Sequence, residues 1–167
     1  RLAHVLPGSE CALARGLANL QRHVENVTER YGLPCVVSLN HFTADSEAEL
    51  ELLRERAGAW GVPLRVARHW AEGGAGAVAV AEEVVRLCQA PGRFRFVYDD
   101  ADPLWEKMRK VATRIYGAAD IAASNGVRAR IDQLEAAGYG RYPVCVAKTQ
   151  YSFSTDPKLR GAPTGHV

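Results

Sequence analysis

The chain has 167 residues, of which 47% are hydrophobic and 24% are charged, a composition typical of a soluble globular protein of one or two domains. Its formal net charge is +2, with Lys and Arg scattered among Asp and Glu, which argues against nucleic acid as a partner. The sequence contains no apolar run of about 18 residues and no signal peptide, so we expect no membrane partner either.

The four cysteines are far apart in the sequence: Cys11, Cys35, Cys88 and Cys145. They form no C-x-x-C pair, which excludes zinc ribbons and redox motifs. Their apolar surroundings predict buried thiols in a reducing cytoplasm. Because the chain begins at Arg1 rather than at Met and ends soon after a turn-rich segment, we expect it to be a piece of a longer protein.

The first predicted element is an amphipathic helix, because apolar residues recur at spacings of three and four: Leu13, Leu17, Leu20, Val24, Val27 and Tyr31. Gly32 ends this helix, and residues 35–39 are short and rich in Val, which is typical of a strand buried on both faces. Ser46 with Glu49 three residues later forms a capping box, which predicts a helix from there to about residue 57.

Strands and helices continue to alternate along the rest of the chain. We predict strands at 62–67, 94–98 and 143–147, and helices at 77–88, 104–115 and 127–134. Short connections between alternating elements favour an α/β fold, a mostly parallel sheet with helices on both faces. Ligands of such sheets bind beyond the carboxyl ends of the strands.

Two aromatic residues follow the ends of successive predicted strands. Phe42 comes just after the strand at 35–39, and Trp70 comes just after the strand at 62–67. Two rings at adjacent strand ends can hold a flat heterocycle between them. The alternative is that both rings cap the core beneath the helices.

A histidine precedes each ring. His41 and His69 at strand ends suggest a metal or a general base. Neighbouring residues on a strand point to opposite faces, however, so the histidines are expected to point away from whatever the rings face. The sequence places no third ligand beside them.

The segment "WAEGGAGAVAV" offers a nicotinamide-dinucleotide hypothesis. Gly74, Gly76 and Ala79 match the dinucleotide fingerprint loosely, and Asp99 follows at a predicted strand end. Trp70, Ala71 and Glu72 intervene between the strand and the glycines, where the fingerprint has a tight turn. Glycines ahead of a helix also bind other anions, or only water.

The last predicted strand leads into "AKTQYSFSTDPKLRGAPTG", where five polar or aromatic donors follow one another: Lys148, Thr149, Gln150, Tyr151 and Ser152. Such density at the carboxyl end of a strand favours a polar or anionic ligand, and a solvated surface loop is the alternative. The chain contains no G-x-x-x-x-G-K-[ST], so it has no P-loop of its own.

The sequence resembles formate–tetrahydrofolate ligase, also called formyltetrahydrofolate synthetase. The stretches that carry the resemblance run in order from about residue 13 to residue 165: "NLQRHVENV", "GLPCVVSLNHFTADSEAELELL", "HWAEGGAGAVAVAEEVV", "TRIYGA" and "AKTQYSFSTDPKLRGAPTG". Because this family uses no nicotinamide, the resemblance argues against the dinucleotide hypothesis.

The resemblance implies an ATP-dependent ligase that forms a C–N bond. Its members convert formate to formyl phosphate with ATP and Mg, and formyl phosphate then formylates the N10 nitrogen of tetrahydrofolate. They are longer chains, typically tetrameric, whose P-loop lies in an earlier domain. The part present here would supply the folate side of the cleft: an α/β folate-side domain at 1–92 and the truncated start of a further α/β domain at 93–167.

In the family a Phe and a Trp sandwich the pterin, and the match puts them on Phe42 and Trp70. Lys148, Thr149 and Gln150 lie in the family's hallmark segment, and they are expected to line or support the folate site. His41 and His69 are not carried over as functional. We expect the isolated chain to be inactive, and a non-catalytic module kept for assembly or regulation is the alternative.

Overall fold

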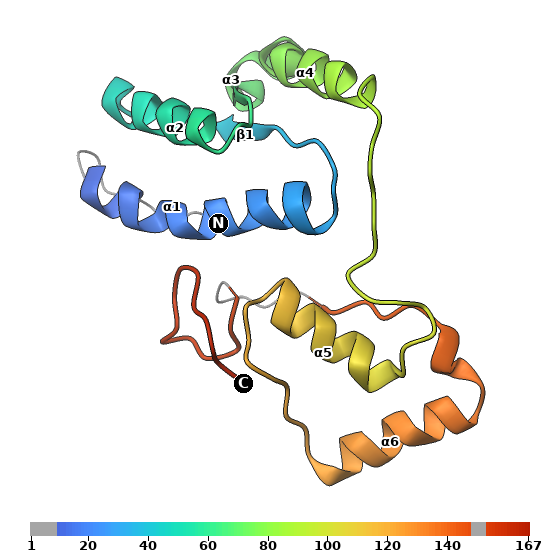
Figure 1. The fold of residues 1–167 in the computed structure, drawn as a ribbon. Helices are drawn as coiled ribbons and strands as arrows, with labels where there is room; N and C mark the ends of the chain where they lie inside the picture. Colours follow the sequence, from blue (N-terminus) through green and yellow to red (C-terminus); the bar gives the residue numbers. More distant parts are fainter. Residues whose placement is uncertain (1–9, 148–152) are drawn as a thin grey trace. The chain divides into compact units, whose positions relative to one another are not determined.

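The computed structural model describes residues 10–147 and 153–167, which form two compact units divided between Phe94 and Arg95. The first unit holds helices α1 (Glu10–Glu25), α2 (Glu47–Ala59), α3 (His69–Glu72) and α4 (Val78–Cys88). It also holds strands β1 (Val37–Asn40) and β2 (Leu64–Ala67), a π-helical turn η1 (Asn26–Arg30) and a 3-10 turn η2 (Gly73–Ala77). The second unit holds α5 (Leu104–Arg114), α6 (Asn125–Ala136) and the 3-10 turn η3 (Tyr139–Arg141) (Figure 1).

The sheet consists of β1 and β2, which pair in parallel with Val37 opposite Leu64 and Asn40 opposite Ala67. An α/β fold with a parallel sheet is therefore confirmed, but the sheet is small: residues 10–147 and 153–167 contain no other strand. The strands predicted at 94–98 and 143–147 were wrong, since both segments are described and neither is a strand.

Side chains of alternate residues cover the two faces of the sheet differently. On one face, Val37 packs with Val24 of α1 and Ala57 of α2. A second cluster, Leu13, Leu17 and Leu53, joins α1 to α2 beside it. This confirms the apolar stripe that predicted the first helix.

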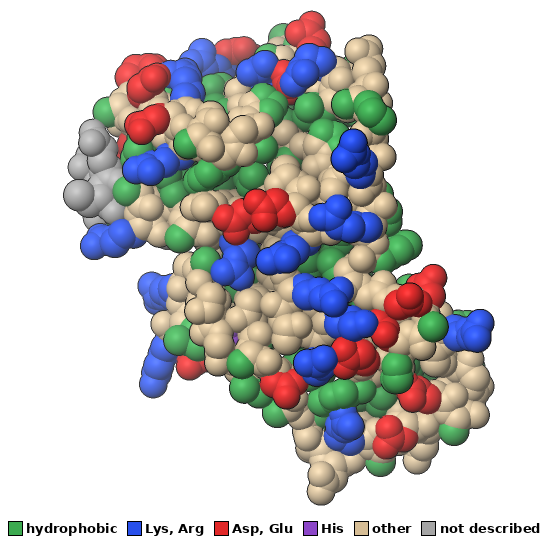
Figure 2. Space-filling view, viewed as in Figure 1, with side chains coloured by type: hydrophobic (Ala, Val, Ile, Leu, Met, Phe, Trp, Pro, Cys, Tyr) green, Lys and Arg blue, Asp and Glu red, His purple; other side chains and the backbone are tan. Residues whose placement is uncertain are grey.

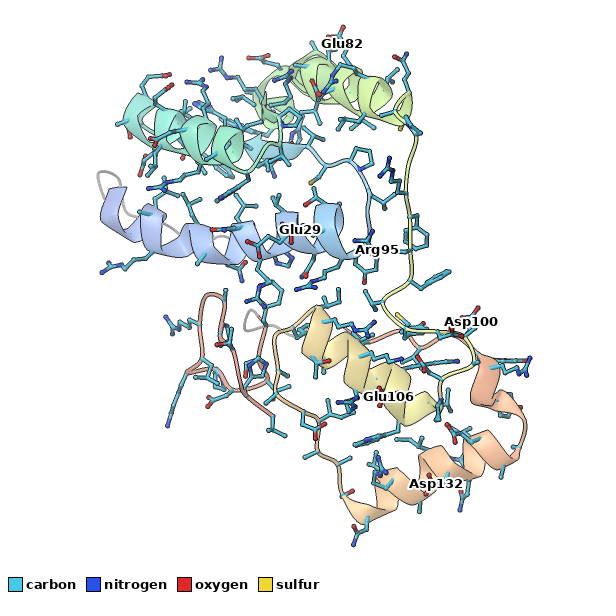
Figure 3. The ribbon with its side chains drawn as sticks, viewed as in Figure 1. Glu29, Glu82, Arg95, Asp100, Glu106 and Asp132 are labelled. Carbon is cyan, nitrogen blue, oxygen red and sulfur yellow. The ribbon has the colours of Figure 1, made fainter. Side chains whose placement is uncertain are left out.

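On the opposite face, α4 covers β2. Arg65 of β2 donates to the Glu83 carboxylate at 2.5 Å, and Arg86 also bonds Glu83. Glu83 is buried, whereas its neighbour Glu82 projects from the outer side of α4 (Figure 3). The outer face of β1 carries Ser38 and Asn40, both exposed, so only β2 is covered on both faces.

A local signal sets the start of α2 as predicted. The Ser46 hydroxyl oxygen accepts the Glu49 N–H at 3.3 Å, and the Glu49 carboxylate accepts the Ser46 N–H at 2.9 Å. The two bonds form the predicted capping box, which satisfies two donors that a helix start leaves free.

In the second unit, two side chains bond the backbone of distant residues. Lys107 of α5 has 0% of its surface exposed, and its Nζ donates to the carbonyls of Gly140 and Tyr142, each at 3.0 Å. The Tyr98 hydroxyl accepts the Val144 N–H at 3.0 Å and donates to the Val144 carbonyl at 3.2 Å. The segments around 98 and 144 are therefore joined through a side chain rather than through a strand ladder.

An apolar cavity of about 330 Å³ lies within the second unit. It is lined by Trp105 and Met108 of α5, by Val127 and Ile131 of α6, and by Phe153, among others.

Acidic, basic and hydrophobic side chains are all present on the face of the molecule in Figure 2. No helix among the described residues is long and apolar enough to span a membrane.

The cysteine prediction was partly wrong. Cys35, Cys88 and Cys145 are free thiols, but Cys88 and Cys145 are exposed and Cys35 is half-buried. Burial raises the pKa of the Cys35 thiol, so it is less reactive than an exposed one. Cys88 is the last residue of α4, and its apolar neighbours in the sequence do not bury it.

Candidate functional site

The two predicted aromatic residues lie side by side at the carboxyl ends of the sheet. Phe42 follows β1, and Trp70 belongs to α3, which begins just after β2. Their ring centroids are 6.3 Å apart and their planes differ by 21°. The parallel register brings the two strand ends to one edge, which is why residues 28 positions apart in the sequence meet.

Both rings are open to solvent. The exposed fractions are 59% for Phe42 and 53% for Trp70, large values for aromatic side chains. Neither ring therefore caps the core, and the alternative weighed from the sequence is wrong. Exposed rings that stack on each other form an apolar surface that a flat ligand can use.

The spacing of the rings limits what can enter between them. A flat heterocycle in contact with both rings needs about 3.5 Å on each side, so the rings must be about 7 Å apart. The observed 6.3 Å joins the ring centroids, so the space between the two ring planes is at most that distance. A ligand in contact with both rings therefore requires one of the exposed rings to move outward.

Backbone groups at the end of β1 hold both rings in place. The Trp70 indole Nε1–H donates to the His41 carbonyl at 2.5 Å. The Phe42 N–H donates to the Asp45 carboxylate at 2.8 Å, and the Asp45 N–H donates back to the Phe42 carbonyl at 3.0 Å. Analysis of the sequence missed Asp45, although an Asp three residues after a strand end and before a helix cap is a recognisable turn signal.

The two histidines beside the rings differ in burial. His41 is half-buried and acts through its backbone, since its N–H donates to the Ala67 carbonyl at 3.0 Å and its carbonyl accepts from Trp70. His69 is exposed. The described residues contain no group of three or more His, Cys, Asp or Glu side chains able to hold a metal ion, so they form no all-protein cage for one.

The glycine segment is explained by packing. A Cβ atom on Gly76 would lie 2.5 Å from the Arg68 carbonyl carbon, so only glycine allows this close approach. The Arg68 N–H donates to the Gly76 carbonyl at 2.9 Å, which fixes η2 against the start of α3. These contacts account for Gly76 without a dinucleotide.

Asp99, the other half of the dinucleotide hypothesis, closes a turn in the second unit. Its carboxylate accepts the Ala101 N–H at 2.9 Å, and its N–H donates to the Asp102 carboxylate at 2.8 Å. Lys148, Thr149 and Gln150, the remaining predicted site residues, lie outside the described residues, as do Tyr151 and Ser152.

Comparison with known proteins gives one consistent family. Residues 6–167 match the family model described as formate–tetrahydrofolate ligase. A formate–tetrahydrofolate ligase of Methylibium petroleiphilum is 57% identical over 160 residues, which cover 93% of this chain and 28% of that relative.

Two further relatives give the same result. Formate–tetrahydrofolate ligases of Methylobacillus flagellatus and Methylococcus capsulatus are 54% and 57% identical, each over 157 residues that cover 93% of this chain. The chain spans about 28% of the length of these curated relatives. On the family match and these identities, the chain belongs to the formate–tetrahydrofolate ligase family.

Proposed function

We propose that this chain supplies the folate-binding side of an enzyme that joins formate to tetrahydrofolate. Family membership supports the reaction, because the relatives are named formate–tetrahydrofolate ligases. The observation that carries the assignment to this part of the enzyme is the exposed, stacked pair Phe42 and Trp70, 6.3 Å apart at one sheet edge. We assign to this pair the role of a clamp for the flat pterin ring.

The proposed reaction has two steps in the complete enzyme. Formate attacks the γ-phosphoryl group of ATP, which gives formyl phosphate and ADP, and the N10 amine of tetrahydrofolate then displaces phosphate from the formyl carbon. Stacking on Phe42 and Trp70 would fix the pterin, so that the amine is held in one orientation toward the formyl group. The hallmark segment with Lys148, Thr149 and Gln150 is proposed to line or support the same site.

ATP and Mg belong to another part of the enzyme in this proposal. The sequence contains no P-loop, and the described residues contain no cluster of three or more metal-binding side chains. Nucleotide, metal and formate would be bound mainly by residues beyond these 167. The isolated chain is therefore expected to bind tetrahydrofolate weakly and to release no phosphate from ATP and formate.

Calorimetric titration of the full chain with tetrahydrofolate, under nitrogen, tests the clamp. Phe42→Ala and Trp70→Ala are each expected to weaken binding roughly tenfold, because each removes one stacking surface and its apolar area. Phe96→Ala is the matched control, since Phe96 is 61% exposed and also stacks on an aromatic neighbour, Tyr98. Equal binding by the wild-type chain and both clamp variants would reject the proposal.

A further inference from the structure

The turn that follows β1 fixes Phe42 through its backbone. Both polar backbone groups of Phe42 bond Asp45: the N–H donates to the carboxylate at 2.8 Å, and the carbonyl accepts the Asp45 N–H at 3.0 Å. The first of these is a charge-assisted bond, which is stronger than a bond between neutral groups. The Phe42 side chain is 59% exposed, so packing contributes little to its position.

Trp70 bonds the same peptide group as Asp45, from its carbonyl side. Its indole Nε1–H donates to the His41 carbonyl at 2.5 Å, and the His41 N–H extends the sheet by donating to Ala67 at 3.0 Å. The peptide group between His41 and Phe42 is therefore held at its carbonyl by Trp70 and at its N–H by Asp45. Of the two rings, only that of Phe42 is bonded to Asp45 through its own backbone.

We propose that Asp45 is a positioning residue for the folate site, a role that rests on the proposed function of the clamp. By holding the Phe42 backbone, the Asp45 carboxylate keeps the ring within stacking distance of Trp70 before the ligand arrives. A ring ordered in advance loses less conformational freedom on binding, which raises affinity without a contact between Asp45 and the ligand.

The start of α2 does not depend on Asp45, which makes a clean control possible. The capping box has its own pair, with Ser46 N–H donating to Glu49 at 2.9 Å and Glu49 N–H donating to the Ser46 hydroxyl at 3.3 Å. Ser46→Ala therefore weakens the helix that follows the turn and leaves both bonds between Phe42 and Asp45 intact. A purely structural role of Asp45 would make Asp45→Ala behave like Ser46→Ala.

The test uses the full chain labelled with ¹³C in its Phe rings, and the Phe42 signal is identified by its loss in Phe42→Leu. The ring current of Trp70 shifts this signal only while the rings remain stacked. Asp45→Ala is expected to move the Phe42 signal toward that of an unstacked ring and to weaken tetrahydrofolate binding roughly 3- to 10-fold. Asp45→Asn keeps an oxygen acceptor, so its Phe42 signal and its affinity for tetrahydrofolate should both be close to those of the wild-type chain. Ser46→Ala should lower the urea midpoint but change neither the Phe42 signal nor the affinity.

Asp45→Ala with a wild-type Phe42 signal and wild-type affinity would overturn the inference, as would an equal loss of affinity in Ser46→Ala. If Asp45→Ala does not fold, Asp45→Leu takes its place, because leucine keeps the size of the side chain and has no acceptor: an unshifted Phe42 signal with wild-type affinity in that variant would overturn the inference. Failure of the clamp itself is recognised separately, because Phe42→Ala and Trp70→Ala would then bind tetrahydrofolate like the wild-type chain.

Discussion

The two units of the chain are stabilised by different kinds of contact. In the first unit, helices bury apolar side chains such as Leu17, Leu53 and Val24 against each other and against a short parallel sheet. In the second unit, Lys107 and Tyr98 bond backbone groups about 33 to 46 positions away along the chain. Apolar packing supports the short sheet at whose edge the rings of the first unit lie, whereas polar side chains order irregular backbone in the second.

The second unit shows how extended segments are ordered when they form no hydrogen-bonded ladder with another strand. Buried backbone groups must be paired, and strands pair them with one another. Where residues 143–147 form no strand, the Tyr98 hydroxyl supplies both a donor and an acceptor to Val144. The comparison predicts that apolar truncations damage the first unit most and that losses of single polar atoms damage the second.

Leu53→Ala is expected to have the largest effect. Leu53 is buried between α1 and α2, and removal of a core leucine side chain lowers the free energy of unfolding by about 3 kcal/mol. Hydrogen exchange followed by mass spectrometry should show lost protection in α1 and α2 with protection of α5 retained. Equal loss in α5 would break the distinction between the two units.

Lys107→Met should come next, with a loss of about 2 kcal/mol confined to the second unit. The replacement keeps the apolar stem but removes two hydrogen bonds to Gly140 and Tyr142. Arg109→Met in the same helix is the control, because the Arg109 side chain is 42% exposed and ion pairs near the surface, such as its pair with Glu106, stabilise little. Urea unfolding followed by hydrogen exchange in α5 compares them, and equal midpoints for the two variants would contradict the role of Lys107.

Tyr98→Phe removes only one oxygen atom, so it tests the contribution of the Tyr98 hydroxyl alone. A loss of about 1 kcal/mol is expected, together with faster exchange of the Val144 amide proton, whose acceptor is that oxygen. Tyr142→Phe serves as the control because the Tyr142 side chain is exposed. Unchanged Val144 exchange in Tyr98→Phe would mean that the hydroxyl does not replace a strand ladder.

The smallest effect concerns pH in the first unit. The hydrogen bond from Arg86, aided by the charge of Arg65, holds the pKa of Glu83 below its usual range, although burial opposes this shift. Its stabilising contribution is therefore present above the unfolded-state pKa of about 4.3 and is lost as the pH falls through the folded-state pKa.

Urea titrations from about pH 6 to pH 3 measure this contribution. Glu83→Gln should flatten the fall in stability of the first unit at acid pH, whereas Glu82→Gln, which alters the exposed carboxylate next to it, should not. If the stability of Glu83→Gln falls with pH as it does in the wild-type chain, the ion pair between β2 and α4 does not contribute to acid unfolding.

Much of the first unit could be predicted from the sequence because its signals are local. The spacing of Leu13, Leu17 and Val24 predicted α1, and the Ser46–Glu49 pair predicted the start of α2. The two strand errors have one cause. A run of β-branched and aromatic residues indicates extended backbone, but it does not say whether another strand or a side chain such as Tyr98 will pair with it.

The candidate site shows the same limit. Parallel strands with rings at their ends predicted that Phe42 and Trp70 would lie at one edge, and the structure brings them together. The bond from Trp70 to the His41 carbonyl could not be predicted, because it depends on how α3 turns back after β2. Asp45 carried a local signal, but its importance becomes visible only once Phe42 is known to be exposed.

The most direct test of the central claim is the position of tetrahydrofolate on the chain. Nuclear Overhauser effects between pterin protons and assigned ring protons can be recorded on the full wild-type chain under nitrogen. The account predicts effects to both Phe42 and Trp70 and none to the aromatic residues that line the cavity of the second unit, such as Trp105. Effects to Trp105 alone, or to only one of the two clamp rings, would contradict it.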